Sequence, residues 1–134
     1  MIARPRYMKI IKDFMDKPVI KVITGMRRSG KSALLELTKQ ELLNIGKTPD
    51  NIIYINFESL DYSFIKNAID LNNYIKQQIK DNKTYYIFLD EIQKVKDFEK
   101  GINSLRITNQ CSIFITGSNS KMTFKELSTD RSEE

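Results

Sequence analysis

The chain has 134 residues, enough for one domain with a hydrophobic core and short for two. Apolar residues make up 40% of it and charged residues 29%, a balance typical of a soluble globular protein, and every apolar run is far shorter than the roughly 20 residues that cross a bilayer. With no histidine and a single cysteine, Cys111, the sequence excludes the usual zinc sites, an internal disulfide, and Ser-His or Cys-His catalytic pairs. No secretory signal can be recognised, so we expect a cytoplasmic protein with no membrane partner.

The formal net charge of +5 comes from 22 Lys and Arg against 17 Asp and Glu, scattered along the chain. A positive balance favours a polyanionic partner such as nucleic acid, whereas scattered basic residues more often form solvated helix faces. Both interpretations stay open.

The first elements are predicted from spacing. Apolar residues recur at helical intervals between Pro5 and Pro18, which predicts a short amphipathic helix packed on the core. Residues 19–24 are rich in β-branched side chains and predict a strand. A second helical pattern begins at Lys31 and runs to a stop at Gly46.

Strands and helices then continue to alternate. Residues 52–57, 85–89 and 112–116 are apolar runs of strand length, which predicts strands covered on both faces. Between them, one helical pattern comprises Phe64, Ile65, Ala68, Asn72, Ile75 and Ile79, and another comprises Val95, Phe98, Ile102 and Leu105. This alternation predicts a three-layer α/β fold, a parallel sheet of four or more strands with helices on both faces.

The predicted organisation has three parts. Residues 1–17 form an N-terminal helical segment, residues 18–120 form the core domain, and residues 121–134 form a polar tail. One turn of helix is predicted in the tail, around residues 124–127.

A phosphate-binding motif lies between the first predicted strand and the helix that follows it. Residues 25–32 read Gly-Met-Arg-Arg-Ser-Gly-Lys-Ser and match G-x-x-x-x-G-K-[ST]. Glycines let backbone N–H groups converge on phosphate oxygens, Lys31 can reach the β- and γ-phosphates, and the Ser32 hydroxyl can coordinate Mg²⁺. The alternative is a glycine turn that happens to precede Lys-Ser. The predicted nucleotide-binding residues are Gly25, Met26, Arg27, Arg28, Ser29, Gly30, Lys31 and Ser32.

An acidic pair ends the third predicted strand. Asp90 and Glu91 follow Tyr-Tyr-Ile-Phe-Leu at residues 85–89, and ligands of parallel sheets bind at the carboxyl ends of the strands. We predict that Asp90 holds Mg²⁺, directly or through water, and that Glu91 deprotonates the water attacking the γ-phosphorus. The alternative is an ordinary helix N-cap.

Polar residues follow the fourth predicted strand at the same edge. We predict that Ser118, or else Asn119, contacts the γ-phosphate or the attacking water; the alternative is a turn with only local backbone bonds. Other side chains near this edge have two interpretations, contact with the site or a local role: Arg27, Arg28, Gln93 and Glu58.

Three segments carry a family resemblance. They are Val-Ile-Thr-Gly-Met-Arg-Arg-Ser-Gly-Lys-Ser at residues 22–32, Phe-Leu-Asp-Glu-Ile-Gln at 88–93 and Ile-Thr-Gly-Ser-Asn-Ser at 115–120. Together they resemble the signatures of prokaryotic AAA+-type ATPases, in the group often described as predicted ATPases of the AAA+ superfamily, and Arg-Pro-Arg-Tyr at 4–7 resembles the segment preceding their core.

The resemblance implies a P-loop NTPase fold and a role for each matching residue. Lys31 and Ser32 correspond to the Walker A pair, Asp90 and Glu91 to the Walker B pair, and Ser118 or Asn119 to the sensor on the fourth strand.

The resemblance also has a departure. Members of the family continue past the sensor into a Gly-Arg motif, a fifth strand and a helical lid, so we expect this sequence to be a truncated form or a fragment. Residues 19–24 would then lie at an exposed sheet edge. Arg131 follows Asp130 in place of glycine, and no arginine-finger role is transferred to it.

The leading hypothesis is an ATPase module that binds ATP with Mg²⁺ and hydrolyses it, with a homo-oligomeric neighbour as one source of a catalytic arginine. The first alternative is a non-catalytic nucleotide-binding or interaction fragment. A P-loop kinase is disfavoured because the chain after Gly117 offers little material for an acceptor pocket and lid. A GTPase is disfavoured because its nearest base-reading match, Thr-Lys-Gln-Glu at residues 38–41, falls within a predicted helix.

Overall fold

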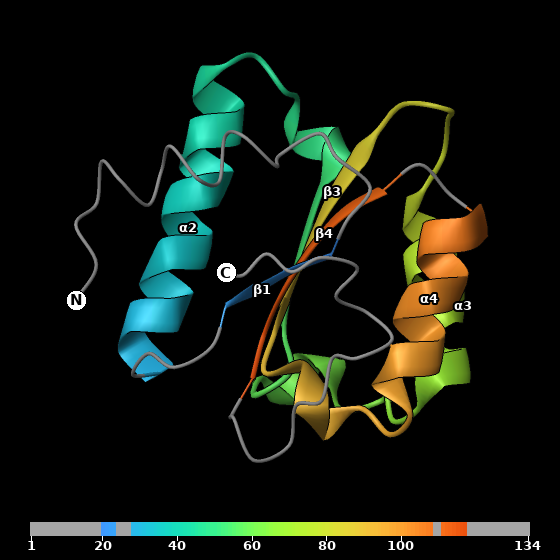
Figure 1. The fold of residues 1–134 in the computed structure, drawn as a ribbon. Helices are drawn as coiled ribbons and strands as arrows, with labels where there is room; N and C mark the ends of the chain where they lie inside the picture. Colours follow the sequence, from blue (N-terminus) through green and yellow to red (C-terminus); the bar gives the residue numbers. More distant parts are fainter. Residues whose placement is uncertain (1–19, 24–27, 109–110, 118–134) are drawn as a thin grey trace.

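A computed structural model describes residues 20–23, 28–108 and 111–117 of the chain (Figure 1). The N-terminal helix predicted between Pro5 and Pro18 and the helical turn predicted at residues 124–127 lie outside these residues. The three-part organisation therefore stays a prediction.

The described residues form a parallel sheet of four strands in the order β1-β4-β3-β2. The strands are β1 (Ile20–Ile23), β2 (Ile52–Asn56), β3 (Tyr85–Asp90) and β4 (Cys111–Thr116). Each strand coincides, within a residue or two, with an apolar run of the sequence. Within this described sheet, β1 and β2 are the end strands, so β4 lies between β1 and β3.

Helices cover both faces of the sheet, which confirms the predicted three-layer α/β fold. Figure 1 shows α2 (Arg28–Asn44) on one side, with α3 (Ala68–Gln78) and α4 (Phe98–Thr108) together on the other. Short 3₁₀ turns connect these elements at Pro49–Asn51, Leu60–Tyr62 and Ile92–Lys94.

The helix α2 begins earlier than the sequence pattern indicated. Its first residue is Arg28, inside the phosphate-binding motif, and not Lys31. It ends as expected at a glycine: Gly46 has a φ of 98°, and its N–H donates to the Leu43 carbonyl while the Lys47 N–H donates to the Leu42 carbonyl. This Schellman arrangement requires the left-handed backbone that glycine adopts without penalty.

The helix α3 is shorter than predicted at its start. Phe64 and Ile65 fit the helical spacing but precede the helix, because Asn67 caps it and accepts a hydrogen bond from the Asp70 N–H at 2.9 Å. Asp70 in turn accepts a bond from the Lys66 N–H at 3.1 Å. An asparagine followed three residues later by an acid is a start signal in the sequence, and apolar spacing alone does not reveal it.

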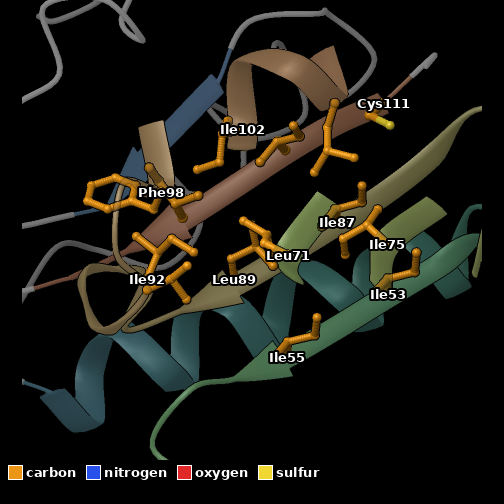
Figure 2. Close-up of a cluster of buried hydrophobic side chains, with 14 of the residues drawn as sticks. Ile53, Ile55, Leu71, Ile75, Ile87, Leu89, Ile92, Phe98, Ile102 and Cys111 are labelled. Carbon is orange, nitrogen blue, oxygen red and sulfur yellow. The ribbon is translucent and has the colours of Figure 1, made fainter. Parts of the chain in front are cut away.

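Strand residues alternate between two hydrophobic clusters. On the α3 and α4 side, isoleucine and leucine dominate, and Figure 2 shows part of this cluster: Ile53, Ile55, Leu71, Ile75, Ile87, Leu89, Ile92, Phe98, Ile102 and Cys111. On the α2 side, the buried cluster consists of Leu35, Leu42, Tyr86, Phe88 and Phe114. A sheet buried on both faces explains why its strands are continuous apolar runs.

Candidate functional site at the carboxyl edge of the sheet

Three polar residues follow one another across the carboxyl edge of the sheet. Asn56 is paired in register with Asp90, the last residue of β3, and Thr116 ends the neighbouring β4. Because side chains alternate along a strand, Asp90 lies on the same face as Phe88, and Thr116 on the same face as Phe114. That face is the one covered by α2.

An aromatic row supports this polar row from within the sheet. The Phe88 ring stacks on the Phe114 ring at 4.8 Å and on the Tyr54 ring at 5.9 Å between centroids. Burial raises the pKa of Tyr54 to about 12, with further contributions from the charges of Asp90 and Glu36. The Asp90 carboxylate therefore lies within electrostatic reach of Tyr54 on β2.

The Thr116 hydroxyl ties the two acidic residues to β4. Its Oγ1 donates to Asp90 Oδ1 at 2.5 Å and accepts a hydrogen bond from the Glu91 N–H at 3.0 Å. Thr116 is fully buried, so both bonds are shielded from water. The end of β4 thereby holds the end of β3 in one arrangement.

Both carboxylates are withdrawn from solvent. Asp90 is 2% exposed and Glu91 is 5% exposed, although acidic side chains are almost never this buried unless they are paired. Such a pair at the edge where α/β proteins bind ligands marks a candidate site.

The backbone at Glu91 adopts an uncommon conformation. Its φ of 61° and ψ of 50° lie in the left-handed region, which is unfavourable for a glutamate and concentrates at functional sites. Glu91 is the N-cap residue of the short 3₁₀ turn Ile92–Lys94, as in the alternative interpretation, but its side chain makes no capping bond. Instead its Oε1 accepts a hydrogen bond from Gln93 Nε2 at 2.8 Å.

The described residues on either side of the phosphate-binding motif lie toward the same edge. Ile23, the last residue of β1, is paired in register with Thr116, so the chain leaves β1 directly beside the Thr116 backbone. It re-enters the described structure at Arg28, and Figure 1 shows the first turn of α2 toward the end of the sheet where β3 and β4 finish. Helix N-termini favour anions, because their first N–H groups have no partner within the helix.

The donor set at this edge fits Mg²⁺ bound together with phosphates. Among the described residues, no group of three or more His, Cys, Asp or Glu could hold a metal ion alone. Mg²⁺ in nucleotide sites takes one or two protein ligands and completes its octahedron with phosphate oxygens and water. Asp90 at the end of β3 is suited to be one of them.

Several predicted site residues fall where the structure says nothing of them. Gly25, Met26 and Arg27 of the motif lie outside the described residues, as do Ser118 and Asn119. The motif residues whose backbone opens α2, but whose side chains are not described, are Arg28, Ser29, Gly30, Lys31 and Ser32. Glu58 is exposed beyond β2, and its N–H donates to Asn56 Oδ1 at 3.0 Å.

Two residues of this edge were not assigned a role from the sequence. Thr116 was recognised only as a strand end, and Asn56 was not considered. Strand alternation puts both on the face of Asp90, but only once the register between neighbouring strands is known.

Away from this edge, four basic residues lie on α4 and on the segment that leads into it. Lys94, Lys96 and Lys100 are exposed, and Arg106 is partly exposed. None of the helices within the described ranges combines the length and hydropathy needed to span a bilayer.

Comparisons with known proteins agree with the fold. The family model described as "AAA domain" matches residues 17–134. An uncharacterized protein of Haemophilus influenzae is 40% identical over 130 residues, covering 96% of this chain and 32% of that protein. An uncharacterized protein of Methanocaldococcus jannaschii is 40% identical over 111 residues, covering 82% of this chain and 23% of that protein.

The chain thus spans a third or less of the length of these relatives. No solved structure matches it significantly. The match over residues 17–134, together with the parallel sheet and the acidic pair at its carboxyl edge, shows that the chain belongs to the AAA domain family.

Proposed function

We propose that this chain binds ATP with Mg²⁺ where α2 begins and β3 and β4 end, and that it hydrolyses the bond to the γ-phosphate. The observation that carries the proposal is the buried Thr116 hydroxyl, which bonds the Asp90 carboxylate and the Glu91 N–H together. A site preorganised in this way does not have to rearrange the Asp90 carboxylate or the Glu91 backbone when nucleotide arrives.

Nucleotide binding would use the opening turn of α2. Its N–H groups and the glycine loop before it would cradle the phosphates, and Lys31 would neutralise the β- and γ-phosphates. Ser32 and Asp90 would hold Mg²⁺, directly or through water. Bound Mg²⁺ neutralises charge that builds on the phosphate oxygens.

Hydrolysis would use Glu91 as the general base. Glu91 accepts a proton from a water molecule, whose oxygen forms a bond to the γ-phosphorus while the bond from that phosphorus to the bridging β–γ oxygen breaks. The electron pair of the broken bond leaves with ADP, and inorganic phosphate carries the new oxygen.

The strand order supports this division of roles. Because β4 lies between β1 and β3, its end lies between the end of β1, the strand that precedes the phosphate-binding motif in the sequence, and the acidic pair. Ser118 and Asn119 follow Thr116 by two and three residues, and we propose that one of them contacts the γ-phosphate.

Binding is tested by titrating the chain with ATP and Mg²⁺ in a calorimeter. Lys31→Ala should weaken binding at least tenfold, about 1.4 kcal/mol, because it removes the charge placed on the β- and γ-phosphates. Lys39→Ala is a matched control: Lys39 lies two turns later on α2, with Nζ 5.7 Å from the centre of the Tyr54 ring. Equal affinities for the unaltered chain and the Lys31 variant would contradict the assignment of the loop.

Hydrolysis is tested by single-turnover release of the γ-phosphate. Glu91→Gln should bind ATP normally and release phosphate about 10²- to 10⁴-fold more slowly, the usual contribution of a general base. Binding without any turnover in the unaltered chain would favour the non-catalytic alternative. Normal turnover in the variant would remove Glu91 as the base.

We propose that partners other than nucleotide are recognised mainly outside the matched segment. We propose that client recognition and mechanical work depend on regions outside the matched segment, since that segment is 32% or less of each relative. A homo-oligomer in which a neighbour supplies an arginine predicts a specific activity that rises with protein concentration. Filter binding to single- and double-stranded DNA and RNA at two salt concentrations tests nucleic acid as a partner.

A further inference from the structure

A rigid turn brings Gln93 back toward Glu91. The left-handed backbone of Glu91 ends β3 and opens the turn, in which the Lys94 N–H donates to the Glu91 carbonyl at 3.3 Å and the Val95 N–H to the Ile92 carbonyl at 2.9 Å. Ile92 and Val95 are buried in the cluster on the α3 and α4 side. Gln93 therefore lies in a turn that is held on both sides by the buried side chains of Ile92 and Val95.

The Gln93 amide is oriented by the carboxylate that it contacts. Its Nε2 donates to Glu91 Oε1 at 2.8 Å, and a carboxylate can only accept, so the amide nitrogen faces Glu91. The bond restrains the carboxylate group of the residue that we propose as general base, and this inference rests on that proposed function.

The other end of the amide is a buried acceptor. Among the described residues, Gln93 Oε1 has no hydrogen-bond partner and is shielded from solvent. A buried acceptor of this kind is unfavourable until a donor reaches it. The Gln93 amide thus has a donor, Nε2, that is bonded to Glu91, and an acceptor, Oε1, that has no donor among the described residues.

A water molecule placed between the two side chains would satisfy both acceptors at once. One of its hydrogens can bond a Glu91 carboxylate oxygen, which has several lone-pair sites and can keep its bond from Gln93. The other hydrogen can bond Gln93 Oε1. With both hydrogens held, the water presents a lone pair of its oxygen away from the two side chains.

We propose that Gln93 is a positioning residue for hydrolysis, holding the Glu91 carboxylate through Nε2 and the attacking water through Oε1. The transferred proton still passes from the water to Glu91, and Gln93 neither gains nor loses a proton. Gln93 acts through Glu91 and the water, so its removal should affect the chemical step and leave nucleotide binding intact.

The test compares single-turnover phosphate release and ATP affinity for Gln93→Ala and Gln93→Met. Methionine preserves the length and volume of the side chain without its polar groups, which separates lost hydrogen bonds from a lost fold. Both variants should bind ATP with unchanged affinity and release phosphate about 10²-fold more slowly, because a misplaced nucleophile costs about that much. Gln78→Ala is the matched control. Gln78 is the last residue of α3 and precedes the amino end of β3, which is the end opposite to the candidate site.

A double-variant comparison identifies the route of the effect. Adding Gln93→Ala to Glu91→Gln should slow phosphate release by much less than 10²-fold, because the bond from Gln93 Nε2 to the Glu91 carboxylate is already removed and only the bond to the water is left to lose. Two full, multiplicative effects would contradict the proposal and indicate a separate structural role. Faster release by Gln93→Ala would also overturn it, since Gln93 would then restrain Glu91 in an inactive orientation.

Failure of this inference differs from failure of the proposed function. Turnover that depends on Glu91 but not on Gln93 would contradict the inference alone. Absence of turnover in the unaltered chain would contradict both.

Discussion

Replacing Thr116 with valine tests the central network of this edge. Valine has nearly the shape of threonine and suits a strand, but it lacks the hydroxyl that accepts from the Glu91 N–H and donates to Asp90 Oδ1. All three residues are buried, so solvent does not replace the lost bonds.

The expected loss of stability follows from these two bonds. A buried N–H left without its partner costs about 1–3 kcal/mol, and a hydrogen bond to a charged group contributes about 1.5–3 kcal/mol. Asp90 and Glu91 retain other interactions, so the summed cost of losing both bonds should lie in the lower part of the combined range. We therefore expect Thr116→Val to lower the free energy of unfolding by about 3–4 kcal/mol.

Urea unfolding followed by circular dichroism measures this change, and the slope with urea should stay constant. Thr116→Ser keeps the hydroxyl and removes one methyl group, so it should cost only about 1 kcal/mol. If the valine variant is as stable as the serine variant, the hydroxyl does not hold the two strands together and the reasoning fails.

Three further outcomes are expected. Glu91→Gly should be more stable than Glu91→Ala by about 1 kcal/mol in urea unfolding, because glycine adopts φ near 61° without strain, and both should lose turnover; a more stable alanine variant would refute the strain. Gly101→Val should destabilise the chain by about 1–3 kcal/mol, because a Cβ at Gly101 would already meet the Ala68 carbonyl oxygen at 3.2 Å and leave no room for a larger side chain; unchanged stability would show that α3 and α4 can separate. Burial raises the pKa of Cys111 to about 11 from 9.0, so the unfolded chain loses its thiol proton first and the stability contribution, fully present below pH 9, falls as pH rises toward 11. Cys111→Ala should flatten that fall in urea titrations across this range, and an unchanged pH dependence would assign it to other groups.

Most elements of the fold could be predicted from local patterns. The apolar runs at residues 52–57 and 85–89 predicted strands because a sheet covered on both faces needs apolar side chains at every position. The errors concern the first residues of two helices, which the spacing of apolar residues did not predict correctly. Asn67 begins α3 later than Phe64 suggested, and α2 begins at Arg28, ahead of the predicted start at Lys31.

The candidate site was predicted only in part, because its contacts join distant segments. Asp90 and Glu91 were identified from the strand that they end. The roles of Thr116 and Asn56 depend on which strands are neighbours and in which register. Thr116 and Asp90 are 26 positions apart in the sequence, and no local signal predicts their bond. The nucleotide roles of Lys31, Ser32 and the other motif residues stay predictions.

The order of elements, the phosphate-binding motif and the acidic pair were determined by the sequence itself, since periodicity, glycine placement and strand ends are local properties. Only the tertiary structure decided that β4 lies between β1 and β3, that Thr116 bonds Asp90 and Glu91, and that a left-handed residue turns Gln93 toward the acidic pair. The reason is that register and strand order come from packing two faces of one sheet against helices from separate parts of the chain.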